Sequence, residues 1–162
     1  MPADIGPGAR GMGVRRTQEW LAANGHHTAI DGAFGPATEA ALKAFQKSKR
    51  LGVTGRLNLP TWLLLTAALR AAVEDSKLGL RRGMDHACLR IARQHLKQYP
   101  HELGGDNRGP WVRSYMLGRD GPEWYWCAGF VSFVLLQAWL QIGGSKTIVG
   151  SVSCDTLESA SD

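Results

Sequence analysis

The stretch Ile30-Asp31-Gly32-Ala33-Phe34-Gly35-Pro36 decides how the first part of this chain folds. Glycine adopts the left-handed backbone region without steric cost, and aspartate accepts hydrogen bonds from nearby backbone amides, so the stretch predicts a tight turn. Pro36 predicts the start of a helix, because the N–H group that proline lacks would have no partner at the first helical position. The stretch therefore predicts a turn that leads directly into a helix.

A helix is predicted on each side of this turn. The upstream segment ends at Asn24-Gly25, which is a typical helix stop. The downstream segment begins at Pro36 and ends before the turn-rich segment 51–55. The residues that repeat at helical spacing are Val14, Thr17, Trp20 and Leu21 in the first segment and Thr38, Ala41, Leu42 and Phe45 in the second.

A third helix is predicted to begin at Pro60. The core of so small a three-helix unit is marginal, so large aromatic side chains must supply much of the burial. We therefore expect Phe34, Phe45 and Trp62 to lie in the core rather than to form a platform for a ligand. The side chains expected along the buried side of the third helix are Trp62, Leu65, Leu69 and Val73.

Composition and charge divide the chain into two parts. The 162 residues are 44% hydrophobic and 20% charged, which is typical of a globular protein and too apolar for a disordered one. The net charge of +5 lies entirely in residues 1–70, and the net charge of residues 71–162 is zero. This asymmetry predicts two modules with different partners. An anionic polymer, either nucleic acid or cell wall, suits the first module, and a solvated basic face without a ligand is the alternative.

Several classes of protein are excluded. No apolar run reaches the ~20 residues of a membrane span, and the first residues lack the basic and apolar regions of a secretory signal. The three cysteines are odd in number and widely spaced, so we expect no disulfide framework, no zinc site and a reducing compartment. No helix-turn-helix, arginine-rich stripe or zinc signature supports nucleic acid binding. We expect no cofactor and no membrane partner.

The helices and turns of the first module carry a characteristic set of residues: Gly13-Val14, Gln18-x-x-Leu21, Gly25, Ile30-Asp31-Gly32-x-Phe34-Gly35, Thr38, Ala41-Leu42, Phe45-Gln46, Leu51, Gly55 and Thr61-Trp62-x-x-Leu65. This set resembles the bacterial peptidoglycan-binding domain, a three-helix wall-targeting module, over residues 9–70. Two departures are Thr17, where the family has leucine, and Asn58, which stands where an acidic helix cap is usual.

This resemblance implies that the first module binds peptidoglycan in a shallow groove that holds muropeptide or glycan. A basic module suits a wall that carries peptide-stem carboxylates and, in some bacteria, teichoic acids. The glycines and Asp31 shape the turn, and the turn residues and the third helix supply the expected contacts. The expected substrate-binding residues of this module are Asp31, Gly32, Phe34, Gly35 and Trp62.

The second module begins after a charged, glycine-containing linker at residues 71–84. Asp85 is the predicted N-cap of a helix that continues to about Tyr99, and Pro100 ends it. We expect Cys88 to be an inert thiol in the core. The inner side of this helix is predicted to consist of Cys88, Ile91, Ala92, His95 and Leu96.

Cys127 stands at the predicted N-terminus of an apolar helix that extends to Gln141. The thiolate is the nucleophilic form of cysteine, and the positive end of a helix dipole lowers the pKa of a thiol. This position therefore favours a nucleophile, whereas a small buried cysteine at a helix start is the alternative.

The segments 102–110 and 125–132, Glu-Leu-Gly-Gly-Asp-Asn-Arg-Gly-Pro and Tyr-Trp-Cys-Ala-Gly-Phe-Val-Ser, accompany this cysteine. Together with 153–157 they resemble the CHAP amidase/endopeptidase family, a papain-like group related to the NlpC-type hydrolases, over residues 85–160. The resemblance implies that Cys127 is the nucleophile. Asn107 and Arg108 would contact substrate or shape the loop, and Trp126 would stack on a sugar or pack beneath the nucleophile.

The histidine that this family requires is missing. A cysteine hydrolase needs a general base, which in the family follows the nucleophile on a strand. All five histidines of this chain precede Cys127, and the only strand-like run after it is 147–149. His101 is a weak substitute, because the family geometry gives no precedent for it. We therefore expect residues 85–162 to be the helical front half of a papain-like domain, with the sheet half absent.

The fold class predicted for the chain is mainly α, with a three-helix peptidoglycan-binding module at 9–70. One functional hypothesis is a cell-wall hydrolase whose second module stops before its histidine, either as a truncated product or as half of a split enzyme whose partner chain supplies the missing half. The other is a peptidoglycan-binding protein with a degenerate or partner-completed second module. We expect synthesis in the cytoplasm and action at the cell wall after export through a holin or a secretion system.

Overall fold

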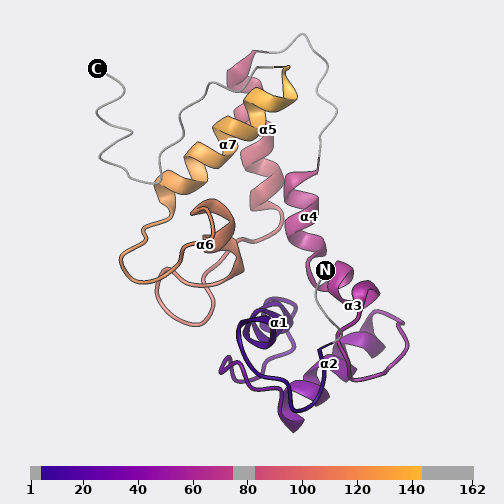
Figure 1. Ribbon diagram of the computed structural model, residues 1–162. Coiled ribbons are helices and arrows are strands. Elements are labelled where there is room, and N and C mark those ends of the chain that lie inside the picture. The colour runs from indigo at the N-terminus through magenta and orange to yellow at the C-terminus, as the bar shows by residue number, and fades with distance from the viewer. Residues whose placement is uncertain (1–4, 75–82, 144–162) are drawn as a thin grey trace. The chain divides into compact units, whose positions relative to one another are not determined.

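Helices joined by turn-rich loops make up residues 5–74 and 83–143, the part of the chain that the computed structural model describes (Figure 1). Within these ranges the β pairing consists of the isolated bridges Ile5–Leu57 and Arg10–Ala33. The prediction of a mainly α protein is thus confirmed. The chain divides into two compact units, with the boundary between Ala67 and Ala68.

Three helices form the first unit: α1 (Met12–Ala23), α2 (Pro36–Ser48) and α3 (Leu59–Leu65). Pro36 occupies the first turn of α2, and Asn58 caps α3 by accepting a hydrogen bond of 3.0 Å from the Thr61 N–H. Both helix starts agree with the sequence prediction. The large side chains of the core are Val14, Trp20, Leu21, Phe34, Leu42, Phe45, Leu57 and Leu65, each no more than 4% exposed.

A fully buried glutamine, Gln18 of α1, holds the turn that precedes α2. Its Oε1 accepts a 2.8 Å hydrogen bond from the Gly32 N–H. Its amide protons are shared among three acceptors at 2.9–3.0 Å, which are Asp31 Oδ1, Ala33 O and Thr38 Oγ1. Gly32 has φ 74°, which glycine adopts without steric cost. The side chain of one helix therefore fixes the entrance of the next.

A second buried glutamine, Gln46 of α2, repeats this arrangement one helix later. Its Oε1 accepts hydrogen bonds of 3.0 Å from the N–H groups of Thr54 and Gly55. Its amide donates to Thr54 Oγ1, Arg56 O and Thr61 Oγ1 at 3.0–3.2 Å. Gly55 has φ 68°, and its place before Thr61 matches that of Gly32 before Thr38. The unit thus contains the same glutamine-and-turn device twice.

The single third helix predicted from Pro60 to Val73 is wrong, because the chain breaks at Thr66. The structure has α3 up to Leu65 and a separate α4 (Ala67–Val73). Thr66 has φ −95° and ψ 11°, and its hydroxyl donates to the Trp62 carbonyl at 2.9 Å, a back-bond that often bends helices. Of the predicted stripe, Leu65 is fully buried, whereas Val73 is 42% exposed.

The second unit contains α4 beyond Ala67 together with α5 (Met84–Leu96), α6 (Pro110–Tyr115) and α7 (Cys127–Gln141). The predicted limits of the apolar helix at Cys127 and Gln141 are confirmed. One cluster joins α5 to α7 and another joins α4 to α6. The buried members of these clusters are Ala87, Ile91, Val134 and Ala138 in the first and Ala72, Trp111 and Tyr115 in the second.

Helix α5 differs from its prediction at both ends. Gly83 is the N-cap. Asp85 lies inside the first turn, where its negative charge interacts favourably with the positive end of the helix dipole. Leu96, predicted to face inward, is 61% exposed. Cys88 is half-buried against the core and burial raises its pKa, which agrees with the inert thiol that we expected. The buried positions of α5 are Ala87, Ile91 and His95.

The boundaries predicted for the two modules and for the linker at 71–84 stay predictions. Residues 75–82 and 144–162 lie outside the described residues, and with them the predicted strand at 147–149 and the family-like segment 153–157.

His95 is the polar centre of the second unit and is fully buried. Its Nδ1 lies 3.0 Å from the Tyr115 hydroxyl and its Nε2 lies 2.9 Å from Gln137 Oε1, so both ring nitrogens have partners. The rings of Phe130 and Phe133 meet it edge-on. Burial lowers the pKa of His95 below the ordinary 6.5, and the hydrogen bond with Gln137 offsets part of that effect.

Replacement of the second buried glutamine, Gln46→Ala, should strongly destabilise the first unit. The N–H groups of Thr54 and Gly55 would lose their buried acceptor, and a cavity would remain, so the free energy of unfolding should fall by about 2–4 kcal/mol. Amide hydrogen exchange at Gly55, followed by NMR, measures this loss. Lys47→Ala, at an exposed neighbour on α2, is the control and should leave the exchange rate unchanged.

Acid should destabilise the second unit through His95. Because its pKa is lower in the folded state, the unfolded chain binds more protons below about pH 6.5, and stability falls as the pH drops through that value. Urea denaturation between about pH 7.5 and about pH 5 measures the slope. His95→Asn should flatten it, while His101→Ala, at an exposed histidine, should not. A slope that His95→Asn leaves intact would contradict this origin.

Candidate ligand-binding pocket

The segment between α5 and α7, which includes α6, is held in place by hydrogen bonds. The Leu103 N–H donates to the Arg108 carbonyl at 2.9 Å, and the Gly121 N–H donates to the Asn107 carbonyl at 2.8 Å. Asp120 pairs with Arg113 of α6 and also accepts a bond from a backbone N–H. These contacts give the loop a fixed shape around α6.

Glu102 ties two parts of this loop together. Its Oε2 accepts a 2.9 Å hydrogen bond from the Asn107 N–H, and its Oε1 accepts a 2.9 Å bond from the indole N–H of Trp126. The Asn107 side chain in turn donates to the Pro122 carbonyl at 3.1 Å. Asn107 has φ 49°, a left-handed conformation that asparagine tolerates better than most residues. One carboxylate therefore positions Asn107 and Trp126 relative to each other.

Trp126 is the N-cap residue of α7 and packs against Tyr115. Its ring lies nearly parallel to that of Tyr115, with an interplanar angle of 8° and 5.6 Å between centroids. The Tyr115 side chain is 2% exposed, and burial raises its pKa. Of the two roles left open for this tryptophan, packing is present in the structure. Trp124, by contrast, lies under the Arg119 guanidinium at 4.8 Å.

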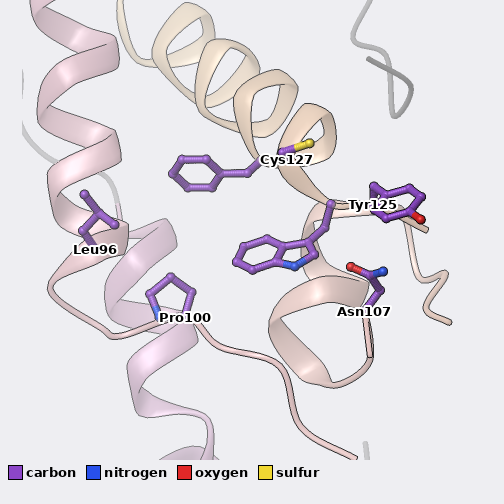
Figure 2. A pocket seen from close by; sticks show the side chains of 7 residues that line it. Leu96, Pro100, Asn107, Tyr125 and Cys127 are labelled. Atoms are coloured by element: carbon purple, nitrogen blue, oxygen red, sulfur yellow. The ribbon is translucent and has the colours of Figure 1, made fainter. Parts of the chain in front are cut away.

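Cys127 is the first residue of α7 and is exposed. It borders a pocket of about 400 Å³ at the meeting point of α5, the loop and α7 (Figure 2). Figure 2 shows Leu96 and Pro100 on one side of this pocket and Tyr125 on the other. The lining residues are Leu96, Pro100, Asn107, Tyr125, Trp126, Cys127 and Phe130.

Three of the predicted site residues meet in this pocket, namely Cys127, Asn107 and Trp126. Arg108, predicted beside them, is half-buried and does not line it. Their roles toward a substrate stay predictions, but their proximity is a finding. Leu96, Pro100 and Glu102 had no predicted role here, because the helical pattern placed Leu96 in the core and gave Pro100 only the end of the helix.

No histidine lines the pocket in the part of the chain that the structure describes. His95 is enclosed by aromatic rings and committed to Tyr115 and Gln137. His101 is exposed, and its Nδ1 lies 2.6 Å from the Tyr99 carbonyl. The geometry thus gives Cys127 a concave and largely apolar setting.

The predicted site residues of the first unit gather at the turn before α2 and on α3. Asp31 is exposed, and hydrogen bonds from the Ala33 N–H and from Gln18 lower the pKa of its carboxyl group. Phe34 is 3% exposed and belongs to the core, whereas Trp62 is half-buried. Gln18, which shapes this turn, and Gln46, which shapes the turn before α3, were recognised in the motif but given no role.

Comparison with known families identifies a domain within the first unit. Residues 10–65 match the family model described as a putative peptidoglycan binding domain. The first unit therefore contains a peptidoglycan-binding domain, which makes peptidoglycan its expected ligand and the cell wall its expected site of action. The match does not extend to the second unit. No curated protein matches the chain.

Two further findings concern only the described residues. Histidine, cysteine and acidic side chains form no group there that would hold a metal ion. Among the same residues, no helix has the length and apolar character needed to span a membrane.

Proposed function

We propose that this protein attaches to bacterial cell walls by binding peptidoglycan through residues 10–65. The match to a peptidoglycan-binding domain carries this proposal. The two glutamine-held turns support it, because they give the surface around α2 and α3 a fixed backbone. A preformed surface binds with less loss of conformational entropy than a mobile one.

Charge supports an anionic partner. The C-terminal end of α2 and the following turn carry exposed cations, Lys47, Lys49 and Arg50. The first unit has few acidic side chains that could neutralise these cations, and one of them, Glu39, already pairs with Lys43 at 2.7 Å. The remaining positive charge suits the carboxylates and phosphates of a bacterial wall, and salt should screen this attraction.

Co-sedimentation with purified sacculi tests wall binding. We expect the chain to pellet with sacculi, and the bound fraction to fall several-fold between about 50 and about 500 mM NaCl. Lys47→Glu combined with Lys49→Glu should weaken binding at low salt, while Arg90→Glu, an exposed residue of α5, is the control. A chain that stays in the supernatant at all salt concentrations would contradict the proposal.

A second candidate function is thiol-dependent cleavage of an amide of the wall by the second unit. The exposed position of Cys127 at the start of α7 and beside a pocket favours it. The thiolate sulfur would attack the amide carbonyl carbon, and the C–N bond would break as the amine leaves with a proton. Water would then hydrolyse the resulting thioester.

This chemistry requires a general base, and no histidine lines the pocket among the residues that the structure describes. We propose that a partner chain supplies this base as a histidine. The peptidoglycan-binding domain would raise the local concentration of substrate for such an assembled site.

Amine release from sacculi tests this second candidate separately from binding. We expect the chain alone to pellet without release, and a lysate of the natural host to restore a release that Cys127→Ala abolishes. Cys88→Ala is the matched control and should keep the activity, because that thiol is half-buried in the core. Equal release by the wild type and by Cys127→Ala would eliminate the thiol mechanism.

A further inference from the structure

The pocket beside Cys127 has a mostly apolar lining. Leu96, Pro100, Tyr125, Trp126 and Phe130 supply most of its surface. Leu96 is 61% exposed and Tyr125 is 70% exposed, so two large side chains remain in contact with water at its mouth. Covering them with an apolar group would be favourable by about 25 cal/mol per Å² of buried surface.

The tryptophan wall of this pocket is rigid. Tyr115 covers the Trp126 ring by parallel stacking, and Glu102 holds its indole N–H. Because two independent contacts fix the ring, a ligand would meet a preformed aromatic surface rather than order one. Aromatic rings prefer offset-stacked or edge-to-face partners, so such a surface favours a planar aromatic group.

Asn107 supplies the polar group of the pocket. Its side-chain nitrogen donates to the Pro122 carbonyl, which fixes the orientation of the carboxamide. Figure 2 shows the oxygen of Asn107 turned toward the side of Leu96 and Pro100, with the nitrogen turned away. Within the described part of the chain this oxygen accepts no hydrogen bond. A ligand that fits must therefore bring an N–H or O–H donor next to its apolar group.

We infer that this pocket binds an aromatic side chain of a peptide, whose neighbouring backbone N–H donates to Asn107 Oδ1. The apolar lining, the fixed indole ring and the Asn107 Oδ1 acceptor together favour that combination. The volume of about 400 Å³ accommodates one aromatic side chain with its amide. The inference concerns the second unit alone and depends neither on wall binding nor on catalysis by Cys127.

Cys127 offers a chemical reporter at the edge of this pocket. N-benzyl-iodoacetamide combines an aromatic ring, an amide N–H and a thiol-reactive carbon, while iodoacetamide lacks the ring. In both reactions the sulfur forms a bond to the methylene carbon, iodide leaves, and the thiol proton passes to the buffer. The ratio of the two alkylation rates at Cys127, divided by the ratio for N-acetylcysteine, measures recognition of the ring.

We expect this normalised ratio, read by mass spectrometry of the full-length chain, to be about ten-fold above one. Leu96→Asp, which places a charge in the apolar wall, should bring it close to one. Leu89→Asp is the matched control, because Leu89 is 58% exposed on the same helix and does not line the pocket. Its ratio should equal that of the wild type. A wild-type ratio of one, or an equal loss in both variants, would overturn the inference.

A protection experiment tests the same pocket with ligands that do not react with the Cys127 thiol. N-acetylphenylalaninamide should slow alkylation of Cys127 by iodoacetamide in a saturable manner, and N-acetylalaninamide should not. Equal protection by the two amides would also overturn the inference. Sacculus binding of the same samples distinguishes this failure from failure of the proposed wall-binding function.

Discussion

The buried amide groups of Gln18 and Gln46 are the interactions on which the first unit depends. Each reaches from one helix into the turn before the next and satisfies backbone groups that the turn would otherwise bury without partners. Unpaired buried polar groups cost about 1–3 kcal/mol each, so the positions of α2 and α3 follow from these two side chains. The residues expected to contact peptidoglycan lie in the first of these turns and on α3, which follows the second.

The second unit is organised differently, around aromatic rings and one buried histidine. His95, Tyr115 and Gln137 form a polar chain inside a shell of phenylalanine and tryptophan rings. This core brings the first turn of α7 next to the loop that Glu102 holds, and the pocket lies where they meet. The chain thus combines a peptidoglycan-binding domain that has a cationic surface with a second unit that has an apolar pocket.

Much of the fold was predictable because local signals agreed with packing. Pro36, Asn58 and the apolar run from Cys127 to Gln141 marked helix limits that the structure confirms. The break at Thr66 was not predictable, because the apolar pattern continues across it and a threonine hydroxyl is compatible with an unbroken helix. Asp85 failed as a cap for a similar reason, since an aspartate also suits the first turn.

The sequence by itself determined most of the helices, the two parts of different charge and the peptidoglycan-binding motif, because these depend on spacing and residue type. Only the tertiary structure decided which residues share a site. It placed Leu96 in a pocket wall instead of the core, brought Asn107 and Trp126 together through Glu102, and left Arg108 outside. Such proximities arise from contacts between residues far apart in the chain, and periodicity carries no information about them.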